Sequence, residues 1–365
     1  MNIRDIARLA NVTPGTVSKV LNNYPDISEA TRQHVLQIIK ENQYTSKNGG
    51  RSLNYTLQVK AGTPYEIELD FEYFRSDAQL NFDIGFKQKV DINASVARVK
   101  DADIVVFASG VSPVLEGEEM GVNLPGFKGG DRTDIELPAI QRELISALHR
   151  AGKKIILVNC SGSPIALEPE TKNCEAILQA WYPGQQGGTA VAEVLFGDYN
   201  PGGRLPVTFY RNMSQLPDFE DYNMTGRTYR YMTQQPLFPF GYGLSYTTFD
   251  YGKLSLDKEQ IKQGEPLKLA VSVTNSGQRD GEEVVQVYLK KQDDAEGPGK
   301  TLRAFKRVYI PAGKSVDVEF DLKDKELEWW DAQSNTMRVC AGKYDIMVGR
   351  SSQDQDLQRG SFVIE

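Results

Sequence analysis

The stretch "AILQAWYPGQQGGTAVAEVLFG", residues 176–197, has the pattern of a buried strand, a glycine-containing loop and a helix. Two short apolar runs precede it, "DIVVFAS" at 103–109 and "KKIILVNCS" at 153–161, with an amphipathic segment at 138–152 between them. Continuous apolar runs are typical of parallel strands that are covered on both faces. The alternation of strands and helices therefore predicts a central α/β region with a parallel sheet, within residues 94–250.

The pattern changes toward the C-terminus. Residues 211–250 are rich in loops and aromatic side chains, and residues 251–365 have closely spaced turns and no helical period. The latter pattern predicts an all-β sandwich. The aromatic run between them either packs the α/β region against the sandwich or stacks on a sugar; it comprises Tyr229, Tyr231, Phe238, Phe240 and Tyr242.

The N-terminal segment predicts a small all-α head. Apolar residues recur at helical spacing in residues 2–10, and Thr13 and Pro14 suit the cap and first position of a second helix. Ser28 is a cap candidate for a third helix. Two short helices joined by a tight turn form the helix-turn-helix unit that reads DNA, although the same pattern also occurs in plain helical bundles.

Between the head and the α/β region the sequence predicts β structure. Residues 55–74 alternate apolar and polar side chains with a turn at Ala61-Gly62, which predicts a β-hairpin, and residues 78–86 predict a further strand. The chain is thus expected to be multidomain. Its predicted parts are a head and hinge at 1–53, a β remnant at 54–93, a partial α/β domain at 94–250 and a sandwich at 251–365.

Composition narrows the possible functions. Residues 1–53 hold seven Lys/Arg against four Asp/Glu, whereas the whole chain has a net charge of −7, so only the head is expected to meet a polyanion. We find neither a run long enough to span a membrane nor a secretory signal pattern, and three scattered cysteines suit a reducing compartment. We therefore expect a cytoplasmic protein without a membrane partner. With two histidines and no Cys-x-x-Cys spacing, we expect neither a metal site nor a cofactor.

The head resembles a known DNA-binding module. The strings "TVSKVLN" at 16–22 and "ISEATR" at 27–32 are similar to the headpiece of the LacI (lactose-repressor) family, over residues 2–53. The resemblance implies double-stranded DNA as a partner. Pro14 and Gly15 offer no side-chain hydrogen bonds, so base contacts would fall on the remaining polar side chains, and the hinge residue that matches the minor-groove wedge is a leucine. The implied DNA-binding residues are Thr13, Thr16, Ser18, Lys19 and Leu53.

The dimerising sugar-sensing domain of such repressors is not recognisable after Leu53. Two half-sites of an operator are normally engaged by a dimer. A dimer is thus needed for tight DNA binding, and the sequence does not reveal one.

The rest of the chain resembles a different family. "LEGEEM" at 115–120, "GGDRTDIELP" at 129–138, "GQQGGTAVAEVLFGDYNPGGRLP" at 184–206 and "FPFGYGLSYTTF" at 238–249 are similar to glycoside hydrolase family 3, the β-glucosidases and β-xylosidases. The resemblance implies a partial α/β-sandwich domain followed by a fibronectin type III-like domain. It also implies a carbohydrate ligand such as a β-glucoside or β-xyloside.

The resemblance assigns one catalytic residue. In that family a glutamate on a loop of the second domain acts as acid/base, and its setting matches Gly117-Glu118 here. Glu116 and Glu119 are near neighbours, and clustered carboxylates raise one another's pKa, which suits a general acid. The alternative interpretation is that "EGEE" is a solvated loop.

The second carboxylate is not recognisable in these 365 residues. In the family the nucleophile is an aspartate of a preceding (β/α)₈ barrel, a domain of about 250 residues. Residues 1–53 are too few for it and resemble something else. We therefore predict no glycosidase turnover from this chain alone, so that its status as an enzyme is uncertain.

Three interpretations remain open. The chain is a DNA-binding protein with a catalytically inactive hydrolase body, or a β-glucosidase or β-xylosidase fragment whose nucleophile-bearing barrel is supplied by another chain, or a misjoined reading frame. Sequence reasoning favours DNA binding, because the head is the only module that looks complete. The operator, the sugar and the oligomeric state are not determined by the sequence.

Overall fold

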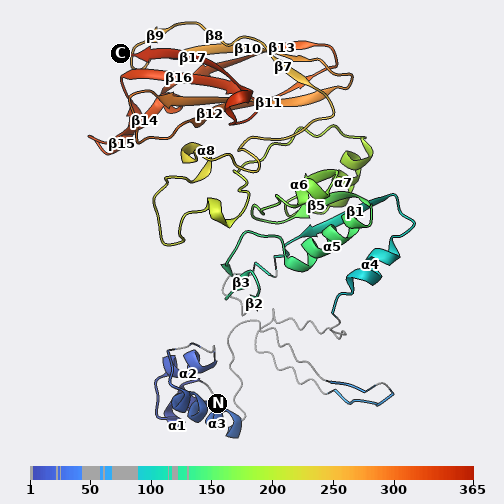
Figure 1. Ribbon diagram of the computed structural model, residues 1–365. Helices are drawn as coiled ribbons and strands as arrows, with labels where there is room; N and C mark the ends of the chain where they lie inside the picture. The colour runs from blue at the N-terminus through green and yellow to red at the C-terminus, as the bar shows by residue number, and fades with distance from the viewer. Residues whose placement is uncertain are drawn as a thin grey trace. The chain divides into compact units, whose positions relative to one another are not determined.

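The computed structural model describes residues 3–21, 24, 26–42, 58–60, 62–67, 89–113, 115–116, 122–129 and 131–365. The chain divides into two units, Met1–Gly85 and Phe86–Glu365. Figure 1 labels most of the helices and strands of both units.

The described residues of the first unit form three helices at the predicted places: α1 (Ile3–Leu9), α2 (Pro14–Leu21) and α3 (Glu29–Glu41). The Thr13 side chain accepts a hydrogen bond from the Thr16 amide at 3.1 Å, and Ser28 accepts one from the Thr31 amide at 3.2 Å, so both predicted caps are present. One small core joins the helices and consists of Ile6, Ala7, Ala10, Val17, Val20 and Val35.

The predicted hairpin is not found in the residues described there. Residues 58–60 and 62–67 contain a turn at Gly62, with φ +78°, but no strand. The Thr63 amide donates to the Lys60 carbonyl at 3.2 Å, and the Lys60 amide donates to the Tyr65 hydroxyl at 3.0 Å, so these backbone groups bond within the turn rather than across a ladder. The strand predicted at 78–86 lies outside the described residues.

The second unit begins with α4 (Ile92–Arg98), which we did not predict, and whose first turn is capped by the Asp91 carboxylate. A parallel sheet follows, with strand order β1-β5-β6. Its strands are β1 (Ile104–Gly110), β5 (Lys154–Cys160) and β6 (Ala176–Gln179). These match the three predicted apolar runs and confirm the α/β assignment.

Helices and short strands complete the α/β region. Helix α5 (Ala139–Arg150) lies between β4 (Asp131–Arg132) and β5 in the chain and runs beside the parallel sheet in Figure 1. Its Ile145 and Leu148 belong to the same hydrophobic core as Ile155 and Leu157 of β5. The remaining elements are β2 (Asn123–Leu124), β3 (Phe127–Lys128), α6 (Glu170–Asn173), α7 (Gly187–Phe196), η1 (Met213–Gln215) and α8 (Thr228–Tyr231).

The C-terminal part is the predicted sandwich, apart from two short helical turns. One sheet has the order β13-β10-β7, with β8 beside β10, and the other has the order β12-β11-β16-β17-β9, while β14 and β15 form a separate hairpin. The bounds are β7 (Phe249–Tyr251), β8 (Ser255–Leu256), β9 (Gln260–Ile261), β10 (Leu267–Asn275), β11 (Gly281–Lys291), β12 (Thr301–Ile310), β13 (Ser315–Leu322), α9 (Asp324–Leu327), β14 (Glu328–Asp331), β15 (Thr336–Val339), β16 (Gly342–Gly349), η2 (Asp354–Asp356) and β17 (Leu357–Ile364).

The aromatic run packs the α/β region against the sandwich. Tyr229 stacks on Phe240 with ring centroids 4.4 Å apart and meets Tyr288 of β11 edge-on at 5.8 Å. An ion pair between Arg204 and Glu283, 2.8 Å apart and almost fully buried, lies between the same two parts. This confirms the packing interpretation of the run.

Candidate active site

Three loops meet at the carboxyl ends of the parallel strands. In an open parallel sheet these ends lie at one edge, where ligands characteristically bind. The loop after β1 carries Glu116, the loop after β5 carries Ser163, and the loop after β6 carries Tyr182. Their side chains contact one another although 47 and 66 positions separate Glu116 from its two partners in the sequence.

Glu116 is held at both carboxylate oxygens. Its Oε1 accepts a hydrogen bond from Ser163 Oγ at 2.8 Å and lies 3.7 Å from the guanidinium of Arg132. Its Oε2 is bonded by the Tyr182 hydroxyl. The Glu116 side chain is only 18% exposed. It is thus a partly buried carboxylate paired with a guanidinium and with hydrogen-bond donors, rather than a charge surrounded by water.

Arg132 comes from the short strand β4 and is itself fixed. It donates to Ser163 Oγ at 3.2 Å and to the Glu136 carbonyl at 3.0 Å. Its guanidinium carbon lies 5.9 Å from the centroid of the Phe127 ring, within the range of a cation–π contact. The three-stranded meander of β2, β3 and β4 thus holds a cation beside the acidic loop.

A buried ion-pair network supports the loop that follows the meander. Arg142 of α5 pairs with Glu136 at 2.5 Å and with Glu170 at 2.9 Å, and it donates to the Ala166 carbonyl at 2.7 Å. Glu170 is completely buried. Burial acts to lower the pKa of Arg142, but the hydrogen bonds and charges of Glu170 and Glu136 outweigh it and raise that pKa. Arg142 therefore keeps its positive charge, and loss of Arg142 would leave two carboxylates, one of them completely buried, without their counter-charge.

Polar side chains at the ends of β5 and β6 hold the loop that carries Ser163. Asn159 and Gln179, register partners at the ends of β5 and β6, donate to Ser161 Oγ at 3.1 and 3.3 Å. Ser161 Oγ in turn donates to the Ser163 carbonyl at 2.8 Å. The pairing of β5 with β6 therefore fixes the position of Ser163, the residue that donates to Glu116.

The position of Tyr182 depends on two backbone features. A Cβ at Gly162 would lie 2.5 Å from the Tyr182 ring, so only glycine lets the ring pack there. The preceding residue, Trp181, has φ +56°, a strained conformation of the kind that clusters at functional sites. Burial, and next the hydrogen bond to Glu116, raise the pKa of the Tyr182 phenol, so it remains a donor at neutral pH.

The sequence-predicted site residues have different outcomes. Glu118 and Leu53 lie outside the described residues. Thr13 and Thr16 join through their hydroxyls at 2.9 Å, Ser18 is half-buried, and the exposed Lys19 forms an ion pair with Asp26. Sequence reasoning missed Ser163, Tyr182 and Arg132; the signal available was that each of the three predicted strands is followed by a polar or aromatic loop residue.

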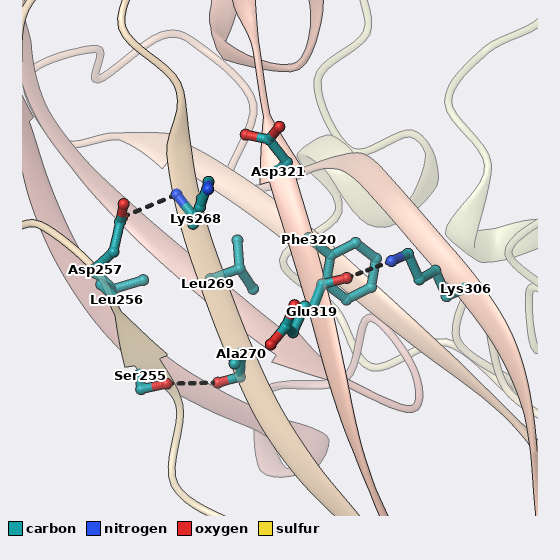
Figure 2. Close-up of a pocket in the computed structure, with 10 residues that line it drawn as sticks. All are labelled: Ser255, Leu256, Asp257, Lys268, Leu269, Ala270, Lys306, Glu319, Phe320 and Asp321. Carbon is teal, nitrogen blue, oxygen red and sulfur yellow. Dashed lines mark hydrogen bonds between the residues drawn. The ribbon is translucent and has the colours of Figure 1, made fainter.

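A concave region lies on the sandwich, far in sequence from the acidic loop. This groove has a volume of about 560 Å³, and Figure 2 shows its ten lining residues. Leu256, Leu269 and Phe320 line it together with two lysines and three carboxylates. Lys306 donates to the Glu319 carbonyl at 2.5 Å and lies 5.2 Å from the centroid of the Phe320 ring. The lining therefore holds one more carboxylate than lysines.

Metal binding, thiol reactivity and membrane insertion can also be judged from the described residues. Among the described residues, no three His, Cys, Asp or Glu side chains cluster closely enough to hold a metal ion. Burial, and then the charge of Glu170, raise the pKa of Cys174 to about 12, so its thiol stays protonated and unreactive. In the part of the chain that the structure describes, the helices are too short or too polar to cross a bilayer.

Comparison with known families identifies the chain. The model of the glycosyl hydrolase family 3 C-terminal domain matches residues 10–246, and that of a fibronectin type III-like domain matches residues 283–352. The chain therefore belongs to glycoside hydrolase family 3 through this C-terminal domain. The match extends into residues 1–53, and the comparisons support the hydrolase fragment rather than the DNA-binding repressor that we favoured from the sequence.

Individual relatives agree. A xylan 1,4-β-xylosidase of Xylanibacter ruminicola is 52% identical over 304 residues, which cover 83% of this chain and 35% of that protein. A periplasmic β-glucosidase of Salmonella typhimurium is 36% identical, with 74% of this chain and 35% of that protein covered. The chain thus spans about a third of the length of these relatives.

Solved structures give the same answer. A β-glucosidase from Erythrobacter marinus is 38% identical with a TM-score of 0.65, covering 75% of this chain and 36% of that one. A Listeria innocua β-glucosidase in complex with glucose is 28% identical with a TM-score of 0.63, covering 75% and 38%.

Proposed function

We propose that the second unit supplies the acid/base side of a retaining β-glycosidase active site, with Glu118 as the acid/base and β-xylosides or β-glucosides as substrates. The observation that carries this proposal is the anchoring of Glu116. Contacts from the loops after β5 and β6 and from strand β4 converge on it, two residues before Glu118. The substrate class follows the xylosidase and glucosidase names of the relatives.

The proposed chemistry uses two carboxyl groups about 5–5.5 Å apart. Glu118 protonates the glycosidic oxygen as the leaving group departs and a nucleophilic carboxylate takes the anomeric carbon. Glu118 then removes a proton from the water that hydrolyses the glycosyl ester. We propose that the nucleophile belongs to a (β/α)₈ barrel outside these 365 residues, because no stretch of this sequence resembles that domain.

The test is reconstitution. The full chain is assayed on an aryl β-xyloside and an aryl β-glucoside, alone and mixed with the separately produced part of the Xylanibacter relative that this chain does not match. We expect no turnover alone and measurable turnover in the mixture. Glu118→Gln is expected to reduce that turnover about 10²–10⁴-fold, the usual contribution of a general acid/base.

The control is Glu143→Gln, which changes an exposed glutamate of α5 and should leave turnover unchanged. Hydrolysis by the chain alone that is lost in Glu118→Gln would contradict the missing nucleophile. Turnover of the mixture that is indifferent to Glu118→Gln would contradict the assignment of the acid/base.

A second candidate function is DNA binding by residues 3–42. It is favoured by the self-contained core of α1, α2 and α3 and by the exposed Lys19 on α2. Lys19 would have to exchange its ion pair with Asp26 for a phosphate, and a monomer would bind one half-site weakly. This function would place the chain in the cytoplasm.

Fluorescence anisotropy with a pool of palindromic duplexes tests this second function. Binding should weaken steeply as salt rises, because phosphate contacts release counterions. Lys19→Ala should reduce affinity more than Lys40→Ala, which changes an exposed lysine in the last turn of α3. Soluble protein that binds no duplex at low salt would rule this function out.

A further inference from the structure

The acidic loop holds three glutamates within four positions, and the structure distinguishes the first of them. Glu116 has both carboxylate oxygens engaged, Oε1 by Ser163 and Arg132 and Oε2 by Tyr182. A general acid must present its proton to the substrate and take another from water. A carboxylate whose two oxygens are occupied by protein donors is poorly suited to that task, so its chemistry points to a different role.

The partners of Glu116 also bind the backbone of the same loop. The Tyr182 hydroxyl lies 2.9 Å from the carbonyl oxygen of Val111, which is the first residue after β1. Between these two points the chain makes a tight turn, in which the amides of Leu115 and Glu116 donate to the Ser112 carbonyl at 2.9 and 3.2 Å. Tyr182 therefore contacts both ends of the turn that leads into the acidic stretch.

The contacts do not depend on flexible surface groups. Arg132 and Glu116 are both largely buried, at 15% and 18% exposure of their side chains. Ser163 is fixed through Ser161 by the strand ends, and Tyr182 is placed by the missing Cβ at Gly162. An anchor built from such preorganised groups holds a loop to the precision that a catalytic carboxyl requires.

We propose that Glu116 is a positioning residue, which Ser163, Arg132 and Tyr182 clamp so that the turn at Ser112–Glu116 presents Glu118 to the substrate. The proposal deepens the glycosidase function above and rests on it for the role of Glu118. The clamp itself is a property of this chain and is measurable without any enzymatic activity.

The first measurement is amide hydrogen exchange in the full chain. Tyr182→Phe removes the hydroxyl that bonds Glu116 Oε2. Glu116→Gln replaces one of the two carboxylate oxygens with an NH2 group and removes the negative charge. In each variant we expect the Leu115 and Glu116 amides to exchange about tenfold faster, the effect of losing one charge-assisted hydrogen bond. Tyr222→Phe, in an exposed loop tyrosine, is the matched control and should change nothing at these amides.

Two further results decide the outcome of this measurement. If the two amides keep their exchange rates in both Tyr182→Phe and Glu116→Gln, the clamp does not hold the turn and the proposal is wrong. The exchange rates of the β5 amides serve as the folding check. Loss of an anchor specific to this turn leaves the β5 rates unchanged, whereas a global loss of structure raises exchange in both the turn and β5.

The second measurement separates positioning from proton transfer in the reconstituted mixture. Azide attacks the anomeric carbon of the glycosyl ester, forms a C–N bond and releases the nucleophile's carboxylate, and it needs no base because it is already an anion. It should therefore restore turnover of an activated aryl glycoside to Glu118→Ala but not to Glu116→Ala. Azide rescue of Glu116→Ala would identify Glu116 as the acid/base and overturn the proposal. If the mixture shows no turnover at all, the proposed glycosidase function fails, while the exchange experiment still decides the clamp.

Discussion

The β-sandwich and the parallel sheet of the second unit differ in how completely they bury their own apolar side chains. The sandwich encloses one large core, in which Tyr344, Ile346 and Phe362 are almost fully buried. In the parallel sheet, Ile104 and Val106 of β1 each keep 54% of their exposure. Parallel sheets are normally covered on both faces.

The difference follows from strand neighbours. In the sandwich β10, β11, β16 and β17 each have neighbours on both sides, whereas β1 pairs only with β5 among the described strands. Helix α7 is rich in apolar residues, yet none of its side chains is buried. An apolar pattern specifies a strand or helix, but burial requires a partner surface. Among the described residues, β1 and β6 each have only β5 as a neighbour, and two apolar side chains of β1 stay exposed.

The largest expected effect is in the closed core. Phe362 stacks on Tyr344 with centroids 5.4 Å apart, and Phe362→Ala should lower the free energy of unfolding by about 3–5 kcal/mol because it leaves a cavity. Phe219→Ala, at an exposed loop position, should change it by less than about 0.5 kcal/mol. Urea denaturation followed by circular dichroism measures both. Equal effects would show that the sandwich core is not packed as described.

A smaller loss is expected at the junction of the strand-end loops. Gly110 has φ +128°, and a Cβ there would lie 1.8 Å from the Cys160 carbonyl oxygen. Gly110→Ala should destabilise the α/β region by about 1–3 kcal/mol from backbone strain, with the clash adding to it. Gly188→Ala, which meets no atom within 4 Å and lies in α7, should be neutral or stabilising. Peptide-level exchange of β1 and β5 is the readout, and unchanged protection in Gly110→Ala would contradict this geometry.

The open strand edge predicts self-association rather than instability. An exposed apolar edge is a template for pairing with another chain, and natural proteins block such edges with charge. Val106→Lys should therefore reduce association in sedimentation velocity while changing the unfolding free energy by no more than about 0.5 kcal/mol. Val207→Lys, at an exposed loop position, is the control and should leave association as it is. If Val106→Lys and Val207→Lys sediment identically, the chains do not associate through β1.

The smallest effect is the acid response of the sandwich. Hydrogen bonds from Lys300 and Lys291 hold the pKa values of Asp354 and Asp293 below the ordinary value of 3.8. Since these folded-state pKa values are depressed, the stabilisation is present above pH 3.8 and is lost as pH falls through the lowered values. Urea midpoints measured from neutral pH down to about pH 3 should fall, and Asp354→Asn should flatten the decline. If the urea midpoint of Asp354→Asn falls with pH as steeply as that of the parent, Asp354 does not contribute to the acid response.

Much of the secondary structure could be predicted from local pattern. The runs at 103–109 and 153–161 became β1 and β5, the amphipathic segment became α5, and Gly197 ends α7 with φ +81° as a C-terminal glycine does. Shorter elements could not be predicted in the same way. The two-residue strands β2, β3 and β4 are too short to show a period. Of the alternating segment 55–74, residues 58–60 and 62–67 contain a turn and no strand, and the rest of the predicted hairpin lies outside the described residues.

The site was predicted only at its acidic loop. Glu118 was assigned through resemblance to a family, and it stays a prediction. Glu116, its neighbour, was named without a role, because a sequence pattern cannot distinguish a clamped carboxylate from a solvated one. Its partners Ser163 and Tyr182 are too distant in sequence for any local rule to pair them with it.

The sequence by itself determined the elements of this protein: apolar runs for strands, capping residues for helices, glycine where the backbone turns, and motif strings for family 3 membership. Only the tertiary structure decided that the loops after β1, β5 and β6 meet, and that Glu116 is held there by Ser163, Tyr182 and Arg132. The physical reason is that parallel strands bring their carboxyl ends to one edge of the sheet. Strand order and register, which are set by packing across the whole domain, therefore choose which side chains become neighbours.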